Sequence, residues 1–228
     1  DCHIGSQLAS VGPMVEALQK LLELVEELES VGITLDHLDL GGGLGIAYDD
    51  ESPPSPAEYA KALMDELARW TALRGRPTPR LILEPGRVIA GNAGVLLMSV
   101  LLTKESGTKR FVIVDAAMND AIRPALYAAY HRLEPVAEPQ HGQWTVDVVG
   151  PVCETGDFLA KDREMPRVQA GDLIAMRGAG AYGFSMSSNY NSRPRPPEVL
   201  VDGAVVHIIR RRETLDDLLR GETIIKEA

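Results

Sequence analysis

The N-terminal part of the chain contains two segments with the hydrophobic period of an amphipathic helix. Apolar residues recur at helical spacing over 14–28, after Gly12-Pro13 and before Gly32, so a helix is predicted there. A second helix is predicted to begin at Ser55-Pro56-Ala57-Glu58, which combines an N-cap, a proline in the first turn and the glutamate of a capping box. The apolar face of this second helix carries Tyr59, Leu63, Leu67 and Trp70.

A short apolar run follows each predicted helix. Residues 33–40 read as a buried strand and residues 80–83 as a second short apolar strand, and the apolar positions of both are continuous rather than alternating. Such continuous apolar runs are typical of the strands of a parallel sheet that is covered on both faces. The order helix, strand, helix, strand therefore predicts an α/β part, to which we assign residues 1–91.

Beyond Gly91 the strands alternate and the connections are no longer helical. Trp144, Val146 and Val148 are expected on one face of a strand and Thr145 and Asp147 on the other. Asp202-Gly203 is a hairpin signal between the apolar segments 196–201 and 204–210, and a short helix is predicted from Thr214 to Arg220, with Gly221 as its stop. We therefore expect residues 92–228 to form an antiparallel β domain that ends in a short helix.

Composition and charge exclude several classes of function. The net charge of −10 argues against a nucleic-acid or anionic-membrane partner, and the basic run Arg210-Arg211-Arg212 is interpreted as a solvated strand end. Cys2 and Cys153 lie far apart, and neither they nor the histidines show metal-ligand spacing, so no disulfide scaffold and no metal site are expected. No apolar stretch reaches the ~18–20 residues of a membrane span.

The segment HLDLGGGLGI, residues 37–46, allows two interpretations. Glycine has no Cβ and tolerates positive φ, so such a run forms either a tight turn or a loop that binds an anion through main-chain N–H groups. The spacing fits neither a Walker loop nor the G-x-G-x-x-G fingerprint of dinucleotide-binding folds. From the glycines alone, both interpretations stay open.

Three motifs fall where predicted strands end, which is where α/β folds bind ligands. They are His3–Gln7, Gly41–Gly43 and Glu84–Arg87. A ring that can stack, a hydroxyl, an N–H-rich loop and a carboxylate beside a guanidinium would together bind a phosphorylated aromatic cofactor. Each also has a structural alternative: a core histidine for His3, a helix cap for Ser6 and an ion pair for Glu84 with Arg87.

Six ordered motifs carry a resemblance that covers essentially the whole chain. They are CHIGSQ, LDLGGGLGI, EPGR, MNDAIRPALYAAYH, GPVCETGD and GAYGFSMSSNYNSRPRP. They resemble the pyridoxal-phosphate (PLP)-dependent diaminopimelate decarboxylases, in the class that also holds ornithine decarboxylases and alanine racemases. The resemblance implies the C-terminal part of a PLP-binding (β/α)8 barrel followed by an antiparallel β domain. It also implies a cytoplasmic homodimer with shared active sites that acts on a small amino-acid substrate.

The same resemblance assigns a cofactor site to the N-terminal motifs. His3 would stack on the pyridine ring, and Glu84 would keep the ring nitrogen protonated, which makes the ring a stronger electron sink and favours decarboxylation over racemisation. Catalytic roles are implied for His3, Glu84 and Cys153. The implied cofactor-binding residues are His3, Ser6, Gly42, Gly43, Glu84, Pro85, Gly86, Arg87 and Tyr182.

Substrate residues follow from the resemblance as well. Glu154 would bind a substrate ammonium and Cys153 would return a proton to the substrate Cα. Arg123 suits a dicarboxylic substrate, because arginine binds carboxylates in a bidentate manner. The structural alternatives are a surface Arg123 that caps Asp115 or Asp120 and a buried, small and hydrophobic Cys153. The implied substrate-binding residues are Arg87, Arg123, Tyr127, Glu154 and Tyr182.

The chain departs from the family in its lysines and in its length. None of its six lysines has the setting of the Schiff-base lysine, with two expected on helices and the others in loops or the tail: Lys20, Lys61, Lys104, Lys109, Lys161 and Lys226. A (β/α)8 barrel takes about 250 residues, so we expect a partial chain whose parent converts meso-2,6-diaminopimelate to L-lysine and CO2. The alternatives are a decarboxylase of D-ornithine, D-lysine or carboxynorspermidine, and a non-catalytic PLP-binding module.

Overall fold

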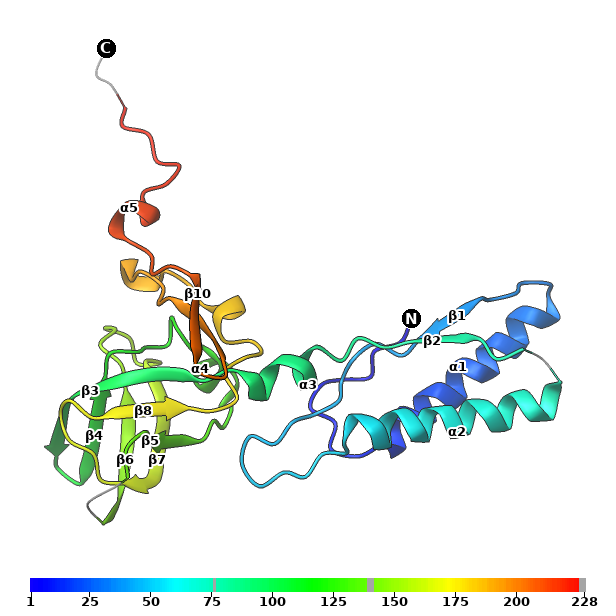
Figure 1. Ribbon diagram of the computed structural model, residues 1–228, viewed down its shortest axis with the longest axis horizontal. Helices are drawn as coiled ribbons and strands as arrows, with labels where there is room; N and C mark the ends of the chain where they lie inside the picture. The colour runs from blue at the N-terminus through cyan, green and yellow to red at the C-terminus, as the bar shows by residue number, and fades with distance from the viewer. Residues whose placement is uncertain (76, 139–141, 226–228) are drawn as a thin grey trace. The chain divides into compact units, whose positions relative to one another are not determined.

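The computed structural model describes residues 1–75, 77–138 and 142–225. The chain forms two compact units, Asp1–Val95 and Leu96–Ala228, which we call unit 1 and unit 2 (Figure 1). The division falls after Val95, four residues beyond the end of the predicted α/β part at 91. Lys226 lies outside the described residues. Among the described helices, none is both long and apolar enough to cross a membrane.

Two helices form most of the core of unit 1. Helix α1 (Gly12–Ser30) and helix α2 (Pro56–Arg74) run side by side (Figure 1). Both begin as predicted, with proline in the first turn, and Ser55 and Glu58 form the expected reciprocal capping box. The buried cluster confirms the apolar faces of both helices: Met14, Leu18, Leu22, Val25, Tyr59, Leu63, Leu67 and Trp70.

Two short parallel strands pack with these helices. Strand β1 (His37–Asp39) pairs in parallel with β2 (Arg80–Ile82), and then come helix α3 (Gly86–Ala90) and the 3₁₀ turn η1 (Gly91–Ala93). The prediction of a buried strand over 33–40 was wrong in its extent, because Ile33 and Leu35 are exposed. The ladder with β2 has only three residue pairs, and an apolar run cannot show where its pairing partner ends.

Unit 2 is built on a six-stranded sheet in the order β5-β8-β3-β4-β6-β7. The prediction of a purely antiparallel sheet was wrong at one pair, because β4 and β6 run parallel. The chain between them includes helix α4 and strand β5, and a long connection of this kind lets a strand return in parallel. The elements are β3 (Leu96–Ser106), β4 (Lys109–Val114), α4 (Arg123–Tyr127), β5 (Leu133–Pro135), β6 (Gln143–Val149), β7 (Phe158–Pro166) and β8 (Leu173–Met176).

The sheet curls until its two edge strands, β5 and β7, contact each other. Val146 and Val148 of β6 are buried in the enclosed core, and Trp144 packs against it, as the alternation predicted. Asp147 faces the other way but is also buried, where it accepts a hydrogen bond of 2.7 Å from the Asp162 N–H. Register shifts in β3 and β6 allow the strong curvature of the sheet.

The C-terminal part of unit 2 confirms a hairpin and a capped helix. Strands β9 (Glu198–Asp202) and β10 (Val205–Arg210) are antiparallel, and Asp202 pairs with Val205, so the two central turn residues are Gly203 and Ala204. The predicted turn was therefore one residue too early. The remaining elements are η2 (Phe184–Met186), η3 (Tyr190–Ser192) and helix α5 (Leu215–Leu218), which Thr214 and Asp217 cap.

Candidate active site

The glycine run after β1 is a turn into which backbone from two other segments packs. A Cβ added to Gly42 would lie 2.4 Å from the carbonyl oxygen of Glu84, and one added to Gly43 would lie 2.5 Å from that of Gly5. The Glu84 N–H donates to the Gly41 carbonyl over 2.8 Å. The ends of β1 and β2 and the segment around Gly5 thus meet in one place, as predicted for three successive strand ends, although the first segment is not a strand.

His3, Ser6 and Arg87 gather at this turn. The His3 ring lies beside the glycines, with Nδ1 3.0 Å from the position of a Cβ on Gly41. Arg87 donates to Ser6 Oγ over 2.8 Å and to the Tyr48 hydroxyl over 2.5 Å. The structural alternatives for two of these residues are wrong: His3 is exposed rather than in the core, and the N-cap of α1 is Val11, not Ser6.

The side chains and N–H groups of this cluster could bind an anionic group and a ring nitrogen. Among the hydrogen bonds of the described residues, none uses the N–H of Gly42 or Gly43. These donors lie beside the guanidinium and hydroxyl of Arg87 and Ser6, which also suit a phosphate. Glu84 is exposed at the same edge, and Pro85 and Gly86 then lead into α3.

In unit 2, three of the predicted substrate residues and Cys153 lie on two neighbouring segments. Helix α4 carries Arg123 and Tyr127, and the loop after β6 carries Cys153 and Glu154. A Cβ added to Gly156 of this loop would lie 3.8 Å from Ala125 Cβ of α4, so the helix and the loop are adjacent.

A buried carboxylate holds the loop that carries Cys153 and Glu154. Asp157 is 6% exposed and accepts hydrogen bonds from the Met118 N–H over 2.7 Å and from the Val152 N–H over 2.6 Å. Cys153 and Glu154 themselves are exposed, so the alternative of a buried structural cysteine is wrong. The loop therefore presents a thiol and a carboxylate to the surface of unit 2 from a fixed backbone.

Glu154 accepts a hydrogen bond from Tyr190. The Tyr190 hydroxyl lies 3.1 Å from Glu154 Oε2. This hydrogen bond and the carboxylate charge raise the pKa of the Tyr190 phenol, which therefore stays protonated and donates. The contact orients the carboxylate to which the resemblance assigns the substrate ammonium.

Arg123 contacts a buried histidine, a partner that the structural alternative did not name. Arg123 Nη1 lies 3.0 Å from Nε2 of His131, which is 2% exposed. Asp115 accepts the Ser99 N–H over 2.8 Å, and Asp120 accepts the Ala117 N–H over 2.9 Å. Burial raises the pKa of the Asp120 carboxyl.

Two tyrosines of the predicted site are exposed to different extents. Tyr127 at the end of α4 is 62% exposed, and Tyr182 is 40% exposed. Tyr182 adopts a left-handed φ of 58°, which costs a non-glycine residue about 1–3 kcal/mol and is frequent at functional sites.

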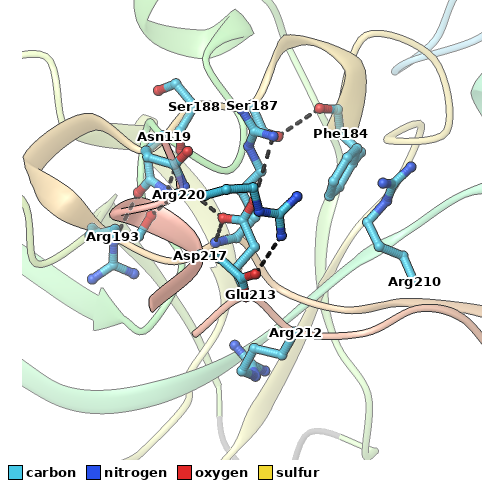
Figure 2. Close-up of polar contacts among 12 residues, drawn as sticks. Asn119, Phe184, Ser187, Ser188, Arg193, Arg210, Arg212, Glu213, Asp217 and Arg220 are labelled. Atoms are coloured by element: carbon cyan, nitrogen blue, oxygen red, sulfur yellow. Dashed lines mark hydrogen bonds and ion pairs between the residues drawn. The ribbon is translucent and has the colours of Figure 1, made fainter. Parts of the chain in front are cut away.

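A polar network fixes the loop that contains Tyr190. The Arg193 side chain donates to Asn119 Oδ1 over 2.9 Å and to the Asp115 carbonyl over 2.6 Å. Glu213 accepts from Asn189 over 2.6 Å and from the Arg195 N–H over 2.8 Å, and Figure 2 shows the contacts around this residue and Asp217. The Arg195 N–H is the main reason that the pKa of the Glu213 carboxyl is lowered.

Sequence reasoning missed Tyr48, His131 and Tyr190 as parts of the candidate site. His131 and Tyr190 lie inside the quoted motifs AAYH and SSNYNSRPRP, but no spacing rule links them to Arg123 or Glu154. Tyr48 follows the glycine turn and reaches Arg87 across 39 residues of sequence. Contacts of this range depend on the fold, so the chain pattern gives no signal for them.

The lysines of the described chain lie on regular elements. Lys20 and Lys61 are on α1 and α2 as predicted, and both form exposed ion pairs. The prediction that the next three lie in loops was wrong, because strands β3, β4 and β7 contain Lys104, Lys109 and Lys161. A strand is hard to predict from alternating apolar and polar positions where its exposed residues are charged, because the alternation is then interrupted.

Comparisons with known proteins show which family the chain is similar to. The family of pyridoxal-dependent decarboxylases, C-terminal sheet domain, matches residues 11–180. Diaminopimelate decarboxylase of Vibrio cholerae is 53% identical over 227 residues, which cover 100% of this chain and 53% of that protein.

Two solved structures are similar over nearly the whole chain. Diaminopimelate decarboxylase from M. jannaschii has a TM-score of 0.93 at 40% identity, covering 98% of this chain and 51% of that one. The enzyme from Helicobacter pylori, complexed with L-lysine, has a TM-score of 0.86 at 41% identity, covering 96% of this chain and 52% of that one. The chain spans about half the length of these relatives, and it belongs to the family of pyridoxal-dependent decarboxylases.

Proposed function

We propose that this chain is the C-terminal half of a PLP-dependent decarboxylase that converts meso-2,6-diaminopimelate to L-lysine and CO2. The observation that carries the proposal is the presence of opposite charges on two adjacent segments of unit 2. Arg123 on α4 and Glu154 on the neighbouring loop can bind a carboxylate and an ammonium of one small molecule. A diamino diacid offers both groups at the end of the molecule away from the reaction.

The residues of unit 1 fit the cofactor. The turn at Gly42 and Gly43 leaves no room for side chains and keeps its N–H groups available for a phosphate, beside Ser6 and Arg87. When bound, PLP supplies an electron sink for the pair of electrons left by the departing CO2. Glu84 holds a proton at the ring nitrogen, and His3 covers a face of the ring.

The residues of unit 2 select the substrate and handle a proton. Arg123 binds the distal carboxylate of the substrate, and Glu154 binds the distal ammonium. Tyr127 and Tyr182 are further substrate-binding residues in this assignment. Cys153 is exposed on the same loop as Glu154 and delivers a proton to the substrate Cα after CO2 leaves. Arg87 serves the phosphate and the substrate carboxylate in this assignment.

The rest of the enzyme would come from sequence that this chain does not contain. The relatives are about twice as long, and the five described lysines lie on helices and strands away from the glycine turn in sequence. We infer that the lysine that bonds the cofactor, and the remaining strands of a (β/α)8 barrel, belong to the other half. We further propose a cytoplasmic homodimer, in line with the family resemblance.

The test is the substrate dependence of Arg123→Ala in the full-length protein. Loss of the guanidinium should raise KM for meso-diaminopimelate about 10- to 100-fold, as expected for a hydrogen bond to a charged group. Arg110→Ala is the control, because Arg110 of β4 forms an exposed ion pair with Glu105 of β3. An unchanged KM, or faster turnover of D-ornithine, D-lysine or carboxynorspermidine, would favour those substrates. No turnover of any amino acid by the full-length protein, despite PLP binding, would favour a non-catalytic module.

A further inference from the structure

His131 is a deeply buried side chain that contacts a proposed substrate residue. It follows α4 and precedes β5, and it is 2% exposed. Its Nε2 lies 3.0 Å from Arg123 Nη1, and its Nδ1 lies 2.9 Å from the carbonyl oxygen of Arg177. Each ring nitrogen therefore has a hydrogen-bond partner that can act in only one role, as a donor or as an acceptor.

Those two partners fix the protonation of the ring. A guanidinium can only donate, so Nε2 must accept from Arg123 with its lone pair. A carbonyl oxygen can only accept, so Nδ1 must carry the proton that is donated to Arg177. The imidazolium form would keep the contact with Arg177 but is incompatible with the contact with Arg123, because its Nε2 would also be a donor. The geometry thus requires a neutral imidazole with its proton on Nδ1.

A neutral acceptor has a specific effect on Arg123. A carboxylate at this position would orient the guanidinium equally well but would cancel its positive charge. The imidazole orients the side chain and leaves the charge intact for an anionic ligand. The main chain of His131 is held as well, since Arg163 Nη1 donates to its carbonyl oxygen over 2.7 Å.

We propose that His131 is a positioning residue that holds Arg123 through a neutral hydrogen bond, so that the guanidinium meets the distal carboxylate of the substrate with its full charge. The proposal rests on the proposed function, because it takes Arg123 to be the carboxylate-binding residue. It makes His131, which touches neither cofactor nor substrate in this assignment, a determinant of specificity for dicarboxylic substrates.

Two substitutions separate the contact with Arg123 from the contact with Arg177. In His131→Asn, the side-chain amide can still donate to the Arg177 carbonyl but is too short to reach Arg123. In His131→Gln, the amide oxygen can take the place of Nε2 and accept from Arg123. In the full-length protein, His131→Asn should raise KM for meso-diaminopimelate about five- to ten-fold with kcat nearly unchanged, the effect of losing one such hydrogen bond. His131→Gln should stay within about twofold of wild type, because it restores the acceptor.

A double-mutant cycle and a spectroscopic measurement complete the test. His131→Asn should add no further rise in KM in an Arg123→Ala background, because its effect acts through Arg123. Ring-nitrogen NMR shifts of His131 should show the Nδ1–H form. Equal KM values for the Asn and Gln variants, additive effects in the cycle, or a proton on Nε2 would each overturn the proposal. An unchanged KM in Arg123→Ala would contradict the proposed function. Observation of the Nδ1–H form in the same protein would still confirm the hydrogen bonds of His131, so the two failures can be told apart.

Discussion

At the scale of single residues, the glycines after β1 are needed for close approach of backbone segments. A Cβ on Gly42 would meet the Glu84 carbonyl oxygen at 2.4 Å, and this atom cannot rotate away because it belongs to the main chain. Gly43 has the same restriction and a φ of 111°, which side chains rarely adopt. Close backbone packing at the glycines is compatible with binding of an anion, since no hydrogen bond among the described residues uses the N–H groups of Gly42 and Gly43.

Gly42→Ala should destabilise unit 1 by about 1–3 kcal/mol, the usual cost of an atom added where backbone cannot yield. The measurement is urea unfolding followed by Trp70 emission in a Trp144→Phe background, which leaves one tryptophan in the chain. Gly12→Ala is the matched control, because a Cβ at Gly12 has no heavy atom within 4 Å. Equal stability of the two variants would show that the Glu84 strand end does not pack on Gly42.

At the scale of elements, α2 is the helix that the local sequence specifies most completely. The Glu58 N–H donates to Ser55 Oγ over 3.2 Å, and Glu58 Oε2 accepts from the Ser55 N–H over 2.8 Å. The Ser55 hydroxyl is the main cause that lowers the pKa of the Glu58 carboxyl below its ordinary value. Because the pKa is lower in the folded state, the stabilisation is present above pH 4.5 and is lost as the pH falls through the folded-state pKa.

Ser55→Ala should lower the free energy of unfolding of unit 1 by about 1 kcal/mol at pH 7, which is typical of a lost N-cap. The difference from wild type should shrink below pH 4.5, where protonation of Glu58 weakens the capping box in the parent too. Urea unfolding at a series of pH values measures both effects. Ser10→Ala is the control, because α1 has no side-chain cap and Ser10 lies outside the helix. A difference that grows toward acid pH would contradict the capping argument.

At the scale of the whole molecule, the chain has two separate hydrophobic cores with one tryptophan each. Trp70 is 7% exposed in the cluster built by α1, α2 and β1. Trp144 packs against the cluster enclosed by the curled sheet of unit 2. Because each core is formed by its own set of elements, each unit can unfold without loss of the other core.

We therefore expect two distinct unfolding transitions from this chain. The single-tryptophan variants Trp70→Phe and Trp144→Phe report unit 2 and unit 1 respectively, and their urea midpoints should differ. Circular dichroism of the wild-type chain should then show a broadened or two-step transition. Coincident midpoints for both tryptophans and for circular dichroism would mean that the two units unfold as one cooperative body.

Helix start and stop signals, the apolar faces of α1 and α2, and the hairpin of β9 and β10 could all be read from the sequence. These features depend on residues within a few positions of one another, such as Ser55 with Glu58 and Thr214 with Asp217. The motifs that the resemblance assigned to the cofactor could also be named, and the structure brings His3, Gly42, Glu84 and Arg87 together. Local propensity and ordered motifs were therefore sufficient for these elements and for one cluster.

The tertiary structure alone decided what depends on pairing across the chain. The short extent of β1 follows from its three-residue ladder with β2, and the parallel pairing of β4 with β6 follows from the route of the chain between them. The Arg123 side chain contacts His131, eight residues later in the chain, and the Tyr190 hydroxyl donates to Glu154, 36 residues earlier. Hydrophobic patterning fixes which face of an element is buried, but it carries no information on which distant backbone or side chain will lie opposite.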